Sequence, residues 1–379
     1  MIFFLLLCLP ILEMEHLLQS FSSLPDFRIN RHKLHDLTEI IFISICAVIC
    51  GCDDYVSIKS WADDNIVWLR QYLVLAHGIP SDDTFRRIFR FLDYEAFNRC
   101  FMDFTNGLSN LTEGEVISFD GKCLRGSKDK KLGKVGVYMM GAWASQNKLL
   151  LGQLKVDEKT NEMIVMPQLL EILFIKGCIV TTDALNCQKV IAEKIIEKEA
   201  DYILAVKGNH PILETQIIQS FELETPTTEF ISHDKDHGRM EKRTCQVLTN
   251  LSWIDQKEEW KNLTSIVKVV SERTIISENK TSIDTRYFIC NQAFTAEKML
   301  ESIRNHWAIE NQLHWSLDVT FDEDRKRNRK DNSAVNTSFL KRITLNLIKQ
   351  EPTKMSIAHK RLKANRSPEF LDKIINIKK

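Results

Sequence analysis

The chain has 379 residues, of which 44% are hydrophobic and 27% are charged. It can therefore bury a sizeable core, it is too long for one ordinary core, and a mainly disordered protein is excluded. Its 51 basic residues balance its 51 acidic residues, so any interaction with nucleic acid has to depend on local charge.

The ten cysteines show no paired spacing, and Cys46, Cys50, Cys100 and Cys178 lie in apolar surroundings. This pattern favours reduced, buried thiols and a cytoplasmic protein. A zinc knuckle of Cys46, Cys50 and Cys52 is an alternative, but a second cysteine or histidine pair is missing from the sequence around it. Buried structural thiols are therefore favoured.

The first residues, 1–13, are nearly all apolar, carry no basic residue and are shorter than the roughly 20 residues of a membrane-spanning helix. We expect an artefactual or nonfunctional extension and no membrane association. Residues 14–110 have helical periodicity throughout, with Asp36 as the N-cap of a helix over 37–49. They predict an N-terminal helical domain that binds DNA.

One helix of this region begins after Ser81 and carries apolar residues at helical spacing, with Arg86 and Arg87 on another face. A short turn followed by an arginine-bearing helix is compatible with a DNA-contacting helix-turn-helix. It is equally compatible with a solvated helix face.

From residue 114 the spacing of the apolar residues changes from helical to extended, and the expected elements include both strands and helices. The expected strands are 115–120, 136–144, 149–156, 179–182 and 202–206, and the expected helices are 163–174 and 187–198. This order predicts an α/β fold with a mixed sheet flanked by helices. The predicted catalytic domain comprises residues 114–207 and 294–350.

Between its two parts, residues 208–293 are expected to form a β-rich insertion. Three segments there alternate as strands, and 221–228 is expected to be a loop. Helical periodicity returns from Ala296, and residues 351–379 form a basic C-terminal tail.

Three acidic residues stand out in this arrangement. Asp120 and Asp183 each end a buried run, on strands that we expect to be neighbours, and Glu310 lies on the helix that follows the insertion. Acids at the end of such strands reach a sheet edge where ligands bind, so a metal-binding carboxylate cluster is predicted. Taken singly, Asp120 and Asp183 could equally start a turn or cap a helix.

Five segments in order give the chain a family resemblance. They are Phe119 to Ser127, Thr182 to Lys189, Tyr202 to Pro211, His237-Gly238-Arg239 and His306 to Trp315. The chain resembles the H-repeat-associated insertion-sequence transposases from about Leu17 to its C-terminus.

The resemblance implies a DDE transposase of ribonuclease-H-like fold in which Asp120, Asp183 and Glu310 are both the catalytic residues and the metal ligands. Two Mg²⁺ ions are implied, with Mn²⁺ as a possible substitute, because two hard cations can serve the attacking and leaving oxygens of a phosphodiester reaction. The implied partners are double-stranded DNA, namely the terminal inverted repeats and the target, and a second copy of the chain during synapsis.

Other hypotheses stay open. His306, Glu310 and His314 are spaced i, i+4, i+8, so a zinc site is geometrically possible, although magnesium suits the two aspartates better. A catalytically inactive, transposase-derived DNA-binding protein and a nonspecific ribonuclease-H-like nuclease are the alternative functions. Trp253 and Trp260 could stack on unpaired bases, but core packing is favoured.

Basic residues near the acids are the candidates for contacts with DNA phosphates, and solvated surface is the alternative. The predicted DNA-binding residues are Arg86, Arg87, Lys122, Arg125, Lys207, Arg304, His306, His314, Arg325, Lys326, Arg327, Arg329 and Lys330.

Overall fold

The computed structural model describes residues 17–29, 31, 33–129, 131, 133, 135–157, 161–236 and 238–376, so the expected extension over 1–13 lies outside the described residues. Its N-terminal part is helical, as predicted. Asp36 and Ser81 are N-caps of the helices that follow them, because their side chains accept hydrogen bonds from backbone N–H groups of the first turn. The helices are α2 (Leu37–Ile49), α3 (Tyr55–Asp64), α4 (Ile66–Leu69), α5 (Asp82–Phe91) and α6 (Tyr94–Leu108).

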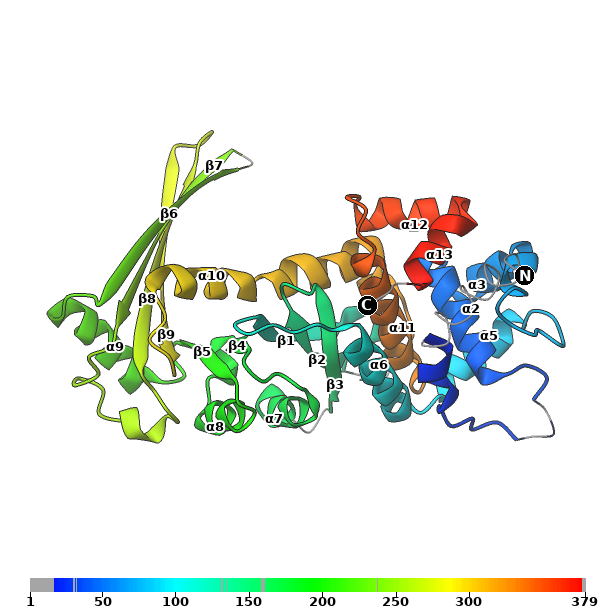
Figure 1. The fold of residues 1–379 in the computed structure, drawn as a ribbon, viewed down its shortest axis with the longest axis horizontal. Coiled ribbons are helices and arrows are strands. Elements are labelled where there is room, and N and C mark those ends of the chain that lie inside the picture. The colour runs from blue at the N-terminus through cyan, green and yellow to red at the C-terminus, as the bar shows by residue number, and fades with distance from the viewer. Residues whose placement is uncertain are drawn as a thin grey trace, which may run out of the picture.

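One mixed sheet of nine strands runs from the centre of the molecule to its left end in Figure 1, in the order β3-β2-β1-β4-β5-β9-β8-β7-β6. The prediction of a mixed sheet with helices is confirmed. Helices α7 (Glu162–Ile172) and α8 (Lys189–Glu197) cover one face. The strands are β1 (Val116–Leu124), β2 (Val137–Ala144), β3 (Leu149–Val156), β4 (Ile179–Thr182), β5 (Asp201–Val206), β6 (Thr228–Asp236), β7 (Arg239–Leu248), β8 (Ser265–Ile275) and β9 (Lys280–Cys290).

The expected adjacency of the two aspartate-bearing strands is present, because β1 pairs in parallel with β4. The end of β1 was predicted wrongly. Pairing with β4 stops at Phe119, but antiparallel pairing with β2 continues to Leu124, so Asp120 lies within the strand, opposite Gly141. Asp120 is therefore the first residue of β1 that no longer pairs with β4 but still pairs with β2.

The segment expected to be an insertion continues the same sheet. β9 pairs antiparallel with β5, and β8, β7 and β6 follow in antiparallel order. An additional helix, α9 (Pro211–Leu223), was not predicted, and its end occupies part of the loop expected over 221–228. Pro211 begins this helix, because proline fits the first turn of a helix.

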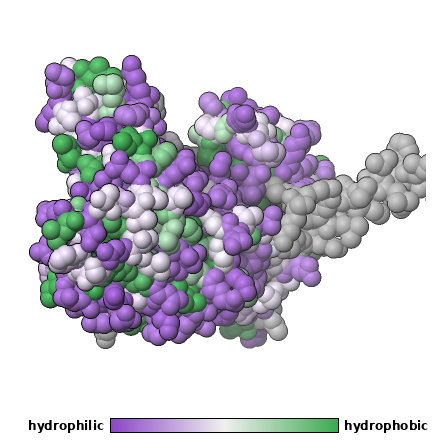
Figure 2. Space-filling model, turned by 60° about the vertical axis from the view of Figure 1, so that its left-hand side comes forward, coloured by the Kyte–Doolittle hydropathy of each residue, from purple (hydrophilic) through white to green (hydrophobic). Residues whose placement is uncertain are grey.

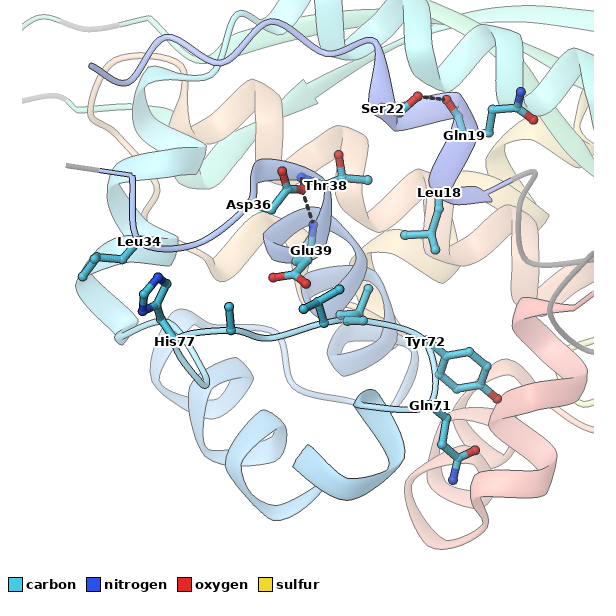
Figure 3. Close-up of a pocket in the computed structure, with 13 residues that line it drawn as sticks. Leu18, Gln19, Ser22, Leu34, Asp36, Thr38, Glu39, Gln71, Tyr72 and His77 are labelled. Carbon is cyan, nitrogen blue, oxygen red and sulfur yellow. Dashed lines mark hydrogen bonds between the residues drawn. The ribbon is translucent and has the colours of Figure 1, made fainter. Parts of the chain in front are cut away.

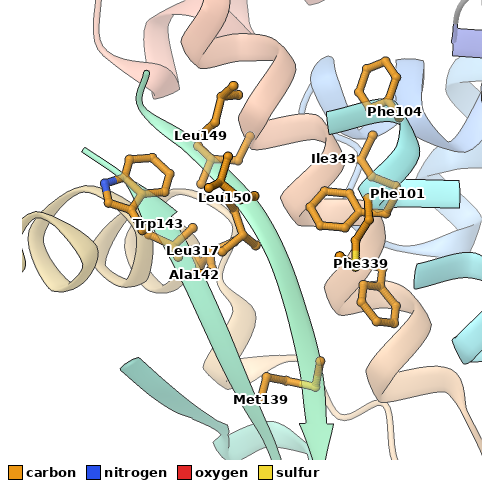
Figure 4. Close-up of a cluster of buried hydrophobic side chains, with 14 of the residues drawn as sticks. Phe101, Phe104, Met139, Ala142, Trp143, Leu149, Leu150, Leu317, Phe339 and Ile343 are labelled. Carbon is orange, nitrogen blue, oxygen red and sulfur yellow. The ribbon is translucent and has the colours of Figure 1, made fainter. Parts of the chain in front are cut away.

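The buried core continues from the N-terminal helices into the sheet. Helix α11 (Ser333–Gln350) is buried along most of its length and packs against α2, α5, α6 and β3. Figure 4 shows Phe339 and Ile343 of this helix beside Phe101 and Phe104, with Leu150 of the sheet nearby. Apolar side chains on both sides of α11 thus join the helical and sheet-bearing parts.

The expected C-terminal tail contains two packed helices, α12 (Ile357–Arg366) and α13 (Pro368–Ile375). Two of its basic residues are buried. Lys360 bonds backbone carbonyls and Glu351, and Arg361 bonds Asp53 at 2.6 Å and the carbonyl of Val48 at 2.9 Å. These two buried cations bind oxygen atoms of neighbouring segments and so hold the helices together, because buried cations need oxygen partners.

One face of the molecule is mostly polar. On the face in Figure 2, hydrophobic residues are scattered among hydrophilic ones. No helix in the described ranges is both long enough and apolar enough to cross a membrane. A hollow of about 960 Å³ lies between α2 and the 71–77 segment, lined by Leu18, Tyr72 and His77 among others (Figure 3).

A buried ion pair fixes the chain just before α11. Arg342 Nη1 lies 2.6 Å from Glu323 Oε1, and both side chains are at most 5% exposed. We expect Arg342→Leu to lower the free energy of unfolding by about 3–5 kcal/mol, because it leaves a buried carboxylate unpaired. Urea denaturation measures this change.

The exposed Arg87→Leu is the matched control and should change stability by less than about 0.5 kcal/mol. The double variant Glu323→Leu with Arg342→Leu should recover much of the loss, because neither member of the pair is then left without the other. A double variant as unstable as Arg342→Leu would contradict this explanation.

Candidate active site

The two aspartates come together at one sheet edge. Asp120 is carried by β1 and is largely buried, with 21% of its side chain exposed. Asp183 directly follows β4, is exposed, and caps the short turn Ala184–Asn186. Its Oδ1 accepts hydrogen bonds from the backbone N–H of Asn186 at 3.2 Å and from Asn186 Nδ2 at 3.0 Å. The capping interpretation of Asp183 and its position beside Asp120 are thus both true.

Asp120 has an unusual charge environment. Burial and the negative charges of Asp183, Glu310 and Glu162 together raise its pKa to about 7, against the lowering effect of a 2.9 Å hydrogen bond from Gly121 N–H. All three carboxylates are therefore close enough to act on Asp120. At neutral pH, Asp120 is partly protonated, and a cation would favour its charged form.

Glu310 lies on a helix that changes its winding. Helix α10 (Ala296–His306) is followed by π-helical segments over Ile309–His314 and Ser316–Thr320. In the first segment, Trp315 N–H donates to the carbonyl of Glu310, five residues earlier. The prediction of α-helical spacing around Glu310 is therefore wrong. A π-helical insertion is a feature often found at functional sites.

The two histidines of this helix contact different aspartate-bearing strands. His306 Nδ1 is 3.1 Å from Thr181 Oγ1 on β4, and His314 Nδ1 is 3.5 Å from Asp120 Oδ2 on β1. Burial lowers the pKa of His306 to about 4 and that of His314 to about 3, so both rings are neutral at pH 7. Their partners orient the Glu310 helix across the two strands.

Within the described part of the chain, no three His, Cys, Asp or Glu side chains are grouped so that they could hold a metal ion. Neither the expected zinc set of His306, Glu310 and His314 nor the expected set of Asp120, Asp183 and Glu310 is therefore assembled as a metal site in this structure. The donor chemistry still fits a hard divalent cation, because the carboxylates around Asp120 offer oxygen atoms and repel one another.

Glu162 is a fourth carboxylate that the sequence analysis missed. It is buried at the first position of α7, and its Oε2 accepts a hydrogen bond from Asn186 Nδ2 at 3.2 Å. The same amide binds Asp183, so Asn186 links the two acids. Asn161, the N-cap of α7, was the available signal, because it predicts a helix start at Glu162 instead of Met163.

The cysteines of the described residues are all free thiols. Cys46, Cys50, Cys100 and Cys178 are buried free thiols, and burial raises the pKa of each. Of the two tryptophans considered for stacking on bases, Trp260 is 1% exposed and belongs to the core, whereas Trp253 is 46% exposed and donates a hydrogen bond to Glu224. The core prediction is therefore confirmed for Trp260 only.

Comparison with known proteins identifies the family. Residues 111–347 match the model of the "Transposase DDE domain" family, and residues 18–105 match that of its associated domain, "DDE_Tnp_1-associated". The chain belongs to the DDE transposase family. Its similarity to H-repeat-associated transposases is confirmed by full-length relatives.

The transposase is 36% identical to the "H repeat-associated putative transposase YhhI" of Escherichia coli (strain K12) over 96% of this chain and 98% of that protein. It is 34% identical to the "Putative transposase YncI" of Escherichia coli O157:H7 over 96% and 95% of the two chains. A piggyBac transposase synaptic complex with hairpin DNA matches 96% of this chain and 79% of that chain at 12% identity, with a TM-score of 0.46.

The basic residues assigned to DNA contact in this transposase are in unlike environments. Lys122 is only 8% exposed, and its Nζ lies 2.6 Å from both carboxylate oxygens of Asp318. We therefore correct its assignment: Lys122 joins β1 to the second π-helical segment. Arg125, 77% exposed, pairs with Asp324, and Arg86 pairs with two aspartates of its own helix.

Other members of this set remain available at the surface. Arg304 pairs with Asp234 at 3.1 Å but is 47% exposed, and Arg329 bonds Asp129 and the carbonyl of Gly126. Lys326 is partly buried. The exposed residues are Arg87, Lys207, Arg325, Arg327 and Lys330.

The raised pKa of Asp120 has a consequence for stability. Its ordinary pKa is 3.8, so its stabilising contribution is fully present below pH 3.8 and is lost as the pH rises through about 7. Without divalent cations, the free energy of unfolding of Asp120→Asn should be about 2–4 kcal/mol higher than that of wild type at pH 8. At pH 4 the two free energies should differ little. Urea denaturation at both pH values tests this, with the exposed Asp64→Asn as control.

Gly121 gives a second test of the site's packing. A Cβ at this position would overlap Glu162 Oε1 and the ring of Tyr138, so we expect Gly121→Ala to lower the free energy of unfolding by about 1–3 kcal/mol. At Gly208 an added Cβ meets no atom within 4 Å, which makes Gly208→Ala the matched control. Equal stability of the two variants in urea denaturation would refute the close approach of Glu162.

Proposed function

We propose that this transposase cuts the ends of its own element and joins them to target DNA, using Asp120, Asp183 and Glu310 as a metal-binding triad. The observation that carries the proposal is the electrostatic environment of Asp120. The charges of Asp183 and Glu310, which come from separate elements, both raise its pKa. Carboxylates crowded together in this way are stabilised by bound divalent cations.

The strand order supports a ribonuclease-H-like core. Strands β1, β2 and β3 form an antiparallel meander, and β4 and β5 continue the sheet parallel to β1. In this arrangement Asp120 and Asp183 belong to the two central neighbours. The helix that carries Glu310 crosses both strands, since its residues contact Thr181 and Asp120.

Mg²⁺, or Mn²⁺ in its place, would be held by Asp120, Asp183 and Glu310, with two ions expected. When bound, these ions favour an oxygen nucleophile and stabilise the leaving oxygen of the phosphodiester. The chain's own groups prepare the site. Asn186 fixes Asp183 and Glu162 relative to each other, and His314 positions the Glu310 helix against Asp120.

Exposed cations supply the surface for DNA. Lys207 follows β5 in a loop joined to the Asp183 loop, because Asn209 Nδ2 donates to the carbonyl of Ala184 at 2.6 Å. The partners are double-stranded terminal repeats, target DNA and a second copy of the chain. We place the reaction in the cytoplasm, because free buried thiols are typical of a reducing compartment.

The decisive experiment is Mg²⁺-dependent cleavage of DNA carrying the element ends by wild type and Asp183→Asn. Asparagine keeps an oxygen that can accept the Asn186 hydrogen bonds but removes the charge. We expect cleavage to fall by more than about 100-fold, because loss of a metal-binding charge costs more than loss of a supporting contact. DNA binding measured without metal should remain.

The exposed Asp64→Asn is the control and should cleave like wild type. Equal inertness of wild type and Asp183→Asn under conditions that support DNA binding would favour an inactive, DNA-binding descendant of a transposase. Cleavage that ignores the element ends would indicate a nonspecific nuclease.

A further inference from the structure

A groove beside the Glu310 helix contains positive charge that the proposed active site does not use. It is about 870 Å³ in volume, which is within the usual range of ligand pockets. Its walls come from the turn between β2 and β3, the second π-helical segment, the end of α11 and the start of α12. Segments distant in sequence thus build a single cavity.

Three lysines converge on this groove. Lys148 comes from the β2–β3 turn, Lys349 from α11, and Lys354 from the loop before α12. Glu351 is the one carboxylate in the cavity wall as described, and it pairs with Lys360 at 3.0 Å. Among the described residues, none of the three lysines forms an ion pair. The groove therefore has an excess of positive charge, which suits an anion.

The lysines are held on a fixed framework. Gln350 Nε2 donates to the carbonyl of Asn147 at 2.8 Å, which ties the β2–β3 turn to α11. Lys349 Nζ lies 5.2 Å from the centre of the Trp143 ring. Burial and the charges of Lys148 and Lys360 lower the pKa of Lys349 to about 8, so the like charges are near enough to repel each other. A polyanion would relieve that repulsion.

The groove also has an exposed apolar wall. Trp315 is 58% exposed and Val319 is 60% exposed, and both line the cavity. An exposed tryptophan beside lysines can stack on a base while the cations contact phosphates. Stacking of this kind needs a base that is not paired in a duplex.

The groove is next to the carboxylates along the same helix. Trp315 directly follows His314, whose Nδ1 is 3.5 Å from Asp120 Oδ2. Neighbouring residues of a helix point about a quarter of a turn apart, so a strand could pass around the helix from the carboxylates to Trp315. We propose that this groove binds an unpaired DNA strand, with Trp315 stacking on a base and Lys148, Lys349 and Lys354 contacting phosphates.

The proposal extends the proposed function, but its test does not require cleavage. Binding of a fluorescent thymidine oligonucleotide of about 20 nucleotides is measured by anisotropy in EDTA over a range of salt concentrations. For Lys148→Gln with Lys354→Gln, the slope of log affinity against log salt should become shallower by about 1.4, since each single-strand phosphate contact contributes about 0.7.

Trp315→Ala should weaken binding of the oligonucleotide about fivefold or more without changing the salt slope, because stacking is not an ionic interaction. The matched controls are Trp253→Ala, which removes another exposed tryptophan, and Lys176→Gln with Lys257→Gln, which removes two exposed lysines elsewhere. Both controls should bind like wild type. Circular dichroism and melting temperature establish that each variant is folded.

Variants that bind the oligonucleotide no worse than their controls would overturn the proposal, as would a wild type that does not bind it. An equal loss of duplex binding would assign the groove to a duplex backbone and also overturn it. Loss of cleavage with normal oligonucleotide binding in Asp183→Asn would leave the groove assignment intact. Failure of the proposed function is thereby distinguished from failure of this inference.

Discussion

Repulsion between carboxylates at the β1–β4 edge is the constraint on which the surrounding structure depends. Asp120, Asp183, Glu162 and Glu310 come from four elements, and three of them act on the first. Buried scaffolding has to hold such a group together, because the acids do not attract one another. Parallel pairing of β1 with β4, the amide of Asn186, and the fastening of the π-helical segment through Lys122 and Asp318 supply that scaffold.

Much of this arrangement could be predicted from sequence. The β-branched runs before Asp120 and Asp183 indicate strands, and the order of elements makes these strands neighbours. Glu162 could not be recognised in the same way, because its importance comes from Asn186 and Gly121, which contact it only in the folded chain. The π-helix was equally hidden, since an extra residue in a turn hardly changes a short apolar pattern.

Charge was the least predictable property. Lys122, Lys360 and Arg361 lie in basic stretches of the sequence, yet each is buried against oxygen partners. By contrast, Lys148 and Lys349 are some two hundred positions apart and meet in one cavity. Density of charge along a chain therefore says little about which cations face solvent, since tertiary packing decides that.

The π-helical winding after α10 also constrains how this chain can change in evolution. Each π-helical segment contains about one residue more than an α-helix would use for the same length. The extra residues let this interval join Glu310, which acts on Asp120, to Asp318, which pairs with Lys122, in a geometry that α-helical winding would not give. The number of residues between Glu310 and Asp318 therefore matters to these two contacts, as the identity of the residues does.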